Sequence, residues 1–325
     1  MSNLTLITGG AGYVGTEVAT ALLDAGREVR VLDSLAFGQD EIAKMLEERG
    51  VDVRIGDVRD DETRRSAVEG AGSIVHLAAI VGDPACARDP ELARETNVEA
   101  TRALIADAAE AGVAHLIFAS TCSNYGRMAD PETPVDEEAP LAPVSLYAEQ
   151  KVEIEKMLLE NGSGPTAATC LRFATVYGAA PRMRFDLTVN EFTRELWADR
   201  DLEVFGEQFW RPYVHVRDAA RGIVTVLEAG PDEVGGDVFN VGDSDENYRK
   251  LDLVEVITAE IPRGNVSYVR KDEDPRDYKV SFAKIRERLG FVPEMRVPDG
   301  VREIAKGLDA EAFGDPFDGK HRNTP

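Results

Sequence analysis

The first 120 residues alternate short apolar runs with helix-like stretches, and a glycine-rich loop joins the first run to the first helix. The run NLTLITGG (3–10) is typical of a strand, and YVGTEVATALLDAG (13–26) has helical apolar spacing and ends at a glycine. Further strand-like runs lie at 27–34, 51–58, 73–79 and 115–120, and a long helix-like stretch covers 90–112. This alternation predicts right-handed βαβ units, and hence an α/β fold with a doubly wound parallel sheet covered on both faces.

The pattern becomes less regular in the second half of the chain. A helix is expected around 145–161 and a strand over 166–178, and irregular loops begin at Ala179. A helix then follows at 186–196, and short strands at 213–216 and 238–241 flank a helix at 218–230. The predicted division is a nucleotide-binding domain of residues 1–178 plus 213–241, a smaller C-terminal substrate-binding lobe of 179–212 plus 242–313, and a loosely ordered tail of 314–325.

The charge of the chain restricts its partners. A formal net charge of −23 argues against nucleic acid and against an anionic membrane surface, because both need a basic face. No apolar run approaches the roughly 20 residues of a membrane span, and no secretory signal is recognisable, so a cytoplasmic location is expected. Three widely spaced cysteines predict no disulfide framework, and four histidines without ligand spacing predict no metal site. An anionic ligand would need a local cluster of arginines.

The loop TGGAGYVG (8–15) has glycines at positions 9, 12 and 15, between the first strand and the first helix. In that context a backbone without side chains can approach a pyrophosphate, and the helix N-terminus offers unpaired N–H groups. Asp33 ends the second strand, where a carboxylate would bind the ribose hydroxyls of NAD and repel the 2′-phosphate of NADP. The alternatives are a glycine turn without a ligand and an aspartate that only caps a turn.

Tyr147 and Lys151 lie four residues apart, which places both on one face of a helix. In most proteins such a pair is an ordinary helix surface. Next to a dinucleotide site it has another use, because a free tyrosine with a pKa of about 10 is a poor base near neutrality. A nearby ammonium and a positive nicotinamide ring would both favour the phenolate and lower the pKa of the tyrosine.

The loop, Asp33, GDV (56–58), HLAA (76–79) and Tyr147-x-x-x-Lys151 occur in an order that resembles the extended short-chain dehydrogenase/reductase family, and most closely its NAD-dependent nucleotide-sugar epimerases and dehydratases. The likeness runs from about residue 4 to about residue 310. It implies a Rossmann sheet, NAD as cofactor, a nucleotide-diphosphate sugar as substrate, and a homodimer formed through helices 90–112 and 145–161.

The resemblance also implies roles for individual residues. Tyr147 would be the acid/base, Lys151 would bind the nicotinamide ribose, and Thr121 would hydrogen-bond the substrate oxygen that loses its proton, although Thr121 could equally satisfy backbone groups at a strand end. The residues expected at the cofactor are Gly9, Gly12, Tyr13, Val14, Gly15, Asp33, Asp57, Val58, Leu77, Ala78, Ala79, Tyr147 and Lys151.

Arginines are expected at the nucleotide end of the substrate. In the family, arginines matching Arg211 and Arg276 hold the diphosphate, a task that suits bidentate guanidinium contacts. The alternative is that both pair with the abundant acidic residues nearby. Further substrate contacts are expected from Thr121, Ser123 and Asn190, and Arg182 and Arg184 near the domain junction are additional candidates.

The reaction type is less strongly indicated. Family 4,6-dehydratases carry Asp-Glu directly after the catalytic threonine, where this chain has Cys122 and Ser123. The serine also counts against a decarboxylase, and Ala174 stands where many 4-epimerases carry asparagine. The favoured interpretation is an epimerase that acts through a transient keto-sugar. The alternatives are an unusual dehydratase, a 4-ketoreductase, and a non-catalytic NAD-binding sensor or assembly subunit.

Overall fold

A computed structural model describes residues 2–128, 130–160, 165–271 and 276–323. Its centre is a seven-stranded sheet in which every neighbouring pair is parallel, with the strand order β10-β6-β5-β4-β1-β2-β3. The order reverses between β1 and β4, which is where doubly wound sheets bind ligands. The predicted fold class is therefore confirmed. The strands are β1 (Leu4–Thr8), β2 (Glu28–Asp33), β3 (Asp52–Ile55), β4 (Ser73–His76), β5 (His115–Thr121), β6 (Ala167–Phe173) and β10 (Asp237–Val241).

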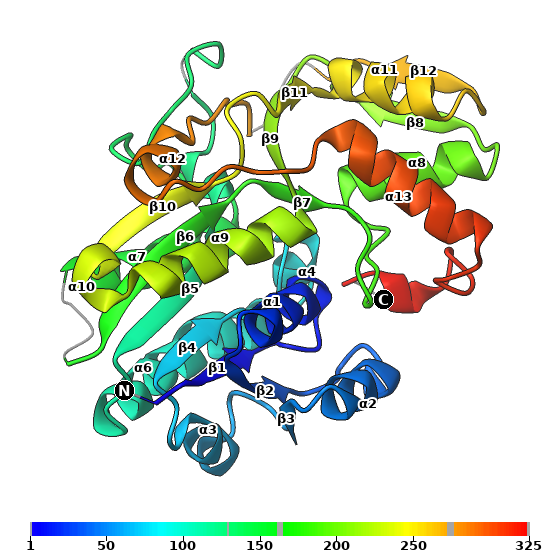
Figure 1. The fold of residues 1–325 in the computed structure, drawn as a ribbon. Helices are drawn as coiled ribbons and strands as arrows, with labels where there is room; N and C mark the ends of the chain where they lie inside the picture. The colour runs from blue at the N-terminus through cyan, green and yellow to red at the C-terminus, as the bar shows by residue number, and fades with distance from the viewer. Residues whose placement is uncertain (1, 129, 161–164, 272–275, 324–325) are drawn as a thin grey trace.

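Helices cover both faces of this sheet, and Figure 1 shows α1 and α9 running side by side over one of them. Successive residues of a strand point to opposite faces, so Ile7 packs in one apolar core and Leu6 in the other. The helices whose side chains enter the Ile7 core are α1 (Tyr13–Asp24), α2 (Asp40–Glu48), α9 (Val216–Ala229), α10 (Pro231–Val234) and α12 (Ala283–Leu289). Those that enter the Leu6 core are α3 (Asp61–Val68), α6 (Ala100–Glu110) and α7 (Leu146–Glu160).

The helix expected over 90–112 is one helical path with an interruption. After α4 (Asp83–Arg88), α5 (Pro90–Arg94) passes through a π-helical turn at Glu95–Glu99 into α6. The turn carries Asn97, whose side chain accepts from the Ile80 backbone N–H at 2.8 Å and donates to Gln150 of α7 at 2.8 Å. Asn97 thus joins the loop after β4 to the helix that carries Tyr147.

A second lobe lies above the sheet in Figure 1. It has a three-stranded sheet, a parallel strand pair and a core of its own around Leu253, Ile257 and Val301. Its strands are β7 (Thr175–Tyr177), β8 (Leu202–Phe205), β9 (Trp210–His215), β11 (Asn247–Arg249) and β12 (Val266–Val269), and its helices are α8 (Thr188–Trp197), α11 (Lys250–Glu260) and α13 (Val297–Asp309).

The expectation of one strand over 166–178 is wrong. The run forms two strands, because β6 keeps its pairing with β10 up to the bond from the Ala174 N–H to the Val241 carbonyl at 3.1 Å, and the chain then pairs with β9 as β7. The strand predicted at 213–216 is confirmed as the end of β9, which pairs with β7 and β11 in the smaller sheet.

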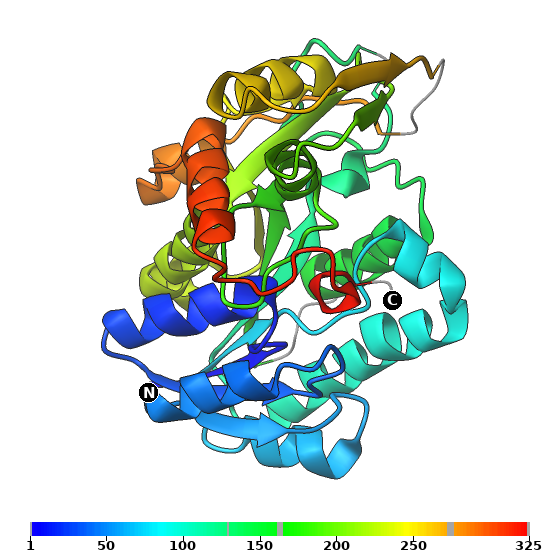
Figure 2. The same ribbon diagram turned by 90° about the vertical axis from the view of Figure 1, so that its right-hand side faces the viewer.

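The tail is also different from the expectation, up to Asn323. Residues Gly319–His321 form a short 3-10 helix, and His321 is buried. The Phe185 N–H donates to the His321 carbonyl at 2.9 Å, so the segment is docked against the loop before α8. In Figure 2 the red C-terminal segment turns back from α13 and crosses the face turned to the viewer. Residues 324–325 of the predicted tail lie outside the described residues.

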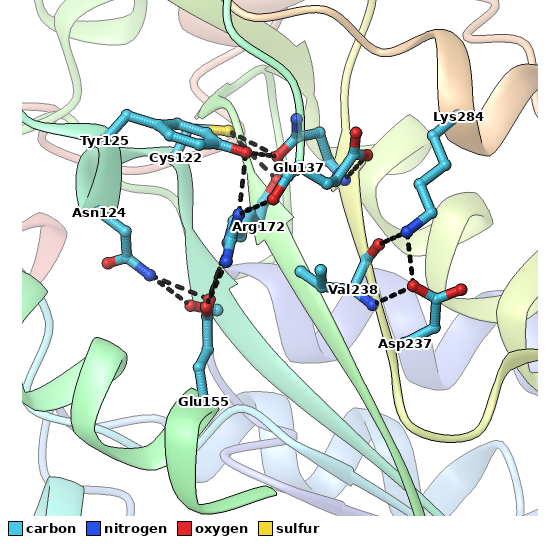
Figure 3. A network of polar contacts seen from close by, with 11 residues as sticks. Cys122, Asn124, Tyr125, Glu137, Glu155, Arg172, Asp237, Val238 and Lys284 are labelled. Carbon is cyan, nitrogen blue, oxygen red and sulfur yellow. Dashed lines mark hydrogen bonds and ion pairs between the residues drawn. The ribbon is translucent and has the colours of Figure 1, made fainter. Parts of the chain in front are cut away.

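A buried polar network fixes α7 to the sheet (Figure 3). Arg172 of β6 and Glu155 of α7 form an ion pair of 2.7 Å, and their side chains are only 4% and 1% exposed. Arg172 also donates to the Tyr125 hydroxyl at 3.0 Å, and Asn124 donates to Glu155 at 3.0 Å. Because both charges are desolvated, each depends on the other for compensation.

We expect Arg172→Met alone to lower the free energy of unfolding by about 3–5 kcal/mol, because it leaves the Glu155 carboxylate buried and uncompensated. The double variant Glu155→Leu/Arg172→Met should recover most of that loss, since it removes both buried charges. Urea denaturation of the wild type, the single variant and the double variant measures this. A double variant that is less stable than the single one would contradict the argument.

Candidate active site

One cavity of about 490 Å³ lies at the carboxyl ends of the parallel strands. Its volume is in the range of small-molecule and cofactor sites. It brings together all the predicted cofactor residues, and also Thr121, Ser123 and Arg276. The predicted residues that line it are Gly9, Gly12, Tyr13, Val14, Gly15, Asp33, Asp57, Val58, Leu77, Ala78, Ala79, Thr121, Ser123, Tyr147, Lys151 and Arg276.

The glycine loop has the geometry that a close backbone approach requires. A Cβ on Gly15 would stand 2.3 Å from the Gly9 carbonyl oxygen, and Gly9 itself has a φ of +74°. Helix α1 begins directly after Gly12, and no side chain caps its N-terminus. Its first N–H groups therefore remain available to an anion, and the loop fits the pyrophosphate of a dinucleotide.

Asp33 stands at the end of β2 as predicted, 8% exposed. Its carboxylate accepts the Ala11 N–H at 3.0 Å and the Leu35 N–H at 2.9 Å, which fixes it between the glycine loop and the loop after β2. Burial raises the pKa of Asp33, and the two backbone bonds oppose that rise. Asp57, after β3, forms an ion pair with Arg59 at 2.7 Å, and the hydrogen bonds from that guanidinium lower the pKa of Asp57.

Tyr147 and Lys151 both face the cavity from α7. The Lys151 Nζ donates to the Ala119 carbonyl at 2.7 Å and lies 5.7 Å from the centre of the Tyr147 ring. Burial lowers the pKa of Lys151 to about 8. Burial also raises the pKa of Tyr147, so the protein groups alone do not produce the lowered tyrosine pKa that we expected. A cationic nicotinamide is the remaining source of such a shift.

At the end of β5, Thr121 and Ser123 line the cavity while Cys122 points away from it. The Thr121 Oγ1 accepts the Ser123 N–H at 3.1 Å, so this hydroxyl begins a 3-10 turn and still faces the cavity. Cys122 is 1% exposed, its Sγ lies 3.3 Å from the Arg172 carbonyl, and burial raises its pKa well above the usual value.

The substrate residues predicted from the second lobe divide into two groups. Arg276 lines the cavity and forms an ion pair with Asp83 at 3.0 Å. Arg211 and Asn190 are not among the residues that line it. The Arg211 guanidinium lies 5.6 Å from the Tyr278 ring, and it is Tyr278 that faces the cavity. Asn190 is fully buried, and its amide bonds to the Gly178 N–H at 2.9 Å and to the Arg184 carbonyl at 2.8 Å.

Several residues of the cavity wall were not predicted from the sequence. Phe37 could have been predicted, because it is an aromatic residue in the loop directly after Asp33. No sequence pattern marks Tyr278 or Asn323 as residues of the cavity wall. Arg182 and Arg184 had only weak support, and both line the cavity. Among the described lining residues, five side chains are cationic and two are carboxylates, which suits an anionic ligand in an acidic protein. The cationic residues are Arg59, Lys151, Arg182, Arg184 and Arg276.

Among residues 2–128, 130–160, 165–271 and 276–323, no group of three or more His, Cys, Asp or Glu side chains could hold a metal ion. No helix there is long and apolar enough to cross a membrane.

Comparison with known proteins gives consistent matches over most of the chain. The model of the NAD-dependent epimerase/dehydratase family matches residues 5–242. The chain is 29% identical over 319 residues to a UDP-glucose 4-epimerase of Streptomyces lividans (90% of this chain and 92% of the relative), and 30% identical over 313 residues to a dTDP-glucose 4,6-dehydratase of Streptomyces griseus (93% and 92%).

The solved structures that resemble this chain also include both an epimerase and a dehydratase. The UDP-glucose 4-epimerase of Thermus thermophilus, crystallised with NAD, has a TM-score of 0.83 at 26% identity and covers 94% of this chain and 99% of its own. The dTDP-glucose 4,6-dehydratase of Streptomyces venezuelae, also with NAD, has a TM-score of 0.84 at 26% identity and covers 96% and 99%. The chain belongs to the NAD-dependent epimerase/dehydratase family of nucleotide-sugar enzymes, and its cofactor is NAD.

Proposed function

We propose that this protein is a nucleotide-sugar epimerase that acts through a transient keto-sugar. The observation that carries the proposal is the side-chain set at the reacting end of the cavity. Tyr147, Lys151 and Thr121 face it, whereas the positions where the resemblance implies the Asp-Glu pair of a dehydratase hold a buried thiol and a serine. These side chains suit the removal and return of a hydroxyl proton. They do not include the pair of carboxyl groups that would act as acid and base in the elimination of water.

In this proposal Tyr147 takes the proton from the sugar hydroxyl and later returns it. Bound NAD would accept the hydride from the carbon that carries this hydroxyl and give it back. The Lys151 ammonium, held by the Ala119 carbonyl, stabilises the phenolate through its charge. Thr121 orients the same sugar oxygen by a hydrogen bond. Inversion follows when the keto-sugar presents its opposite face before the hydride returns.

The nucleotide diphosphate lies toward Arg276 in this proposal. An anion there would compete with Asp83 for the guanidinium, which is 39% exposed and hence accessible. Arg211 then supports Tyr278 behind the wall, so a direct contact between Arg211 and the diphosphate requires a rearrangement. A homodimer through α5, α6 and α7 and a cytoplasmic location remain predictions of the family resemblance.

A dehydratase of unusual type is the main alternative, because relatives of both kinds match the chain about equally well. Such an enzyme would need Cys122 as its elimination acid. Cys122 does not line the cavity, and burial disfavours its thiolate. An NAD-binding sensor is disfavoured by the presence of both Tyr147 and Lys151 in the cavity.

We expect Tyr147→Phe to lower turnover of the nucleotide sugar by about 10²–10⁴-fold, because the ring remains and only the proton-transferring hydroxyl is removed. NAD should still bind. The assay is a panel of nucleotide sugars with mass spectrometry of the products in deuterated water. Epimerisation by hydride return incorporates no solvent deuterium, whereas product that has lost water and gained deuterium would show a dehydratase. Net consumption of reduced nicotinamide would show a ketoreductase.

Cys122→Ala provides the second test of the reaction type. The thiol is buried and faces Arg172 rather than the cavity. We therefore expect the turnover of the variant to lie within about threefold of that of the wild type, because the substitution makes only a small change in core packing. The variant is compared with the wild type on the same substrate. A loss as large as that of Tyr147→Phe would identify Cys122 as a reacting group and favour elimination.

The buried Lys151 predicts a pH dependence of stability. Its pKa of about 8 in the folded protein lies below the ordinary value of 10.5, so between these two values the unfolded chain binds more protons. The wild type should therefore gain stability relative to Lys151→Met as the pH rises from about 8 to about 10.5, by about 3 kcal/mol in total. Urea denaturation of both proteins without NAD at pH 7 and pH 10 measures the difference, and a difference that does not change with pH contradicts the assignment.

A further inference from the structure

We propose that the C-terminal segment Gly319–Asn323 is a wall of the cofactor site, and that it acts by holding Arg182 at the adenosine end of the cavity. The ligand chemistry is the adenosine part of a dinucleotide, with its ribose hydroxyls and phosphate oxygens. The proposal uses the family's cofactor and does not depend on the reaction that the enzyme performs.

Arg182 is the residue through which the segment reaches the cavity. Its side chain lines the cavity although the residue is only 6% exposed. One terminal nitrogen donates to the Asn323 Oδ1 at 2.7 Å, and the other donates to the Arg322 carbonyl at 3.2 Å. Both of these bonds end on the C-terminal segment, so the segment determines where the guanidinium lies.

The guanidinium lies at the adenosine end of the cavity. Its central carbon is 4.4 Å from the centre of the Phe37 ring, which is a cation–π distance. Phe37 follows Asp33 in the loop after β2, and its N–H donates to the Gln39 side chain at 2.8 Å. The charges of Arg182 and Asp33 also act on each other, so the cation stands near the carboxylate expected at the ribose.

The C-terminal segment is fixed to the same loop by bonds that do not involve Arg182. The Phe185 N–H donates to the His321 carbonyl at 2.9 Å, and the Asn323 N–H donates to the Asp186 carboxylate at 3.1 Å. The His321 and Phe185 rings meet edge to face at 5.4 Å. The residues from 182 to 186 and the segment therefore form one unit. Figure 2 shows the red segment beside the green chain that leads into α8.

The guanidinium has donors left for a ligand. It carries five N–H groups, two of which are engaged by the segment, and its Nε–H is buried without a partner among the described residues. A buried cation with unfilled donors is stabilised by an oxygen-rich ligand beside it. An NAD molecule whose pyrophosphate lies on the glycine loop brings its adenosine toward Asp33, and hence toward this wall.

The test is the affinity of the purified full chain for nucleotides, measured by calorimetry after bound cofactor has been removed and without any sugar substrate. We expect Arg182→Gln and Asn323→Ala each to raise the Kd for NAD by about tenfold, as loss of a charge-assisted hydrogen bond would. The Kd for ADP, which has the adenosine and the diphosphate but no nicotinamide riboside, should rise by the same factor. Dissociation of NAD from the loaded protein should be faster by a similar factor.

The matched control is Lys306→Gln, because the Lys306 side chain is exposed on α13 and does not line the cavity. This variant removes one positive charge from the helix that precedes the segment and should leave both Kd values unchanged. The proposal is overturned if Asn323→Ala, folded by circular dichroism, binds NAD and ADP as the wild type does. It is also overturned if Lys306→Gln weakens binding equally, or if the wild type binds no NAD. A wild type that binds NAD but converts no nucleotide sugar refutes the proposed function and not this inference.

Discussion

The position of one face of α7 against the sheet determines what this site can do. Tyr147, Lys151 and Glu155 lie at spacings of four, so they form a single stripe along the helix. The first faces the cavity, the second is held by the Ala119 carbonyl, and the third is buried against Arg172 of β6. A helix surface open to water could not bring an ammonium so close to a phenol and keep both desolvated.

Electrostatic interactions connect the residues of this stripe with one another and with the sheet. Burial lowers the pKa of Lys151, and the negative charge of Glu155 one turn away opposes that lowering. Arg172 in turn compensates Glu155 and is anchored by Tyr125, whose hydroxyl donates to Asn240 of β10 at 2.8 Å. The charges therefore alternate from the cavity into the core, from Lys151 through Glu155 to Arg172.

The sequence allowed prediction of those parts of the site that local patterns encode. The glycine loop, Asp33 and the Tyr147–Lys151 pair each follow from the periodicity of one strand or helix and from a short spacing, and all of them line the cavity. The long-range contacts were not predictable in this way. Ala174 reads as part of a continuous strand, yet its N–H makes the last bond to β10, at Val241, and the chain from Thr175 onward pairs with β9 in the smaller sheet, at residues more than 35 positions away. Asn190 was expected at the substrate, but Tyr13 and Gly178 occupy its amide instead.

The docking of the C-terminal segment also depends on long-range contacts, and it was not predictable from the sequence for the same reason. The tail 314–325 is rich in glycine, proline and polar residues, which is typical of a loosely ordered tail, and no local pattern marks Asn323 as a partner of Arg182. The contact becomes understandable only from the charge of the whole protein. A chain with a net charge of −23 has abundant carboxylates to pair with exposed arginines, as Arg276 does with Asp83. Arg182 forms no ion pair with a described residue, because its terminal nitrogens bond to two neutral oxygens, a carbonyl and an amide. In our proposal its positive charge therefore acts on the anionic cofactor.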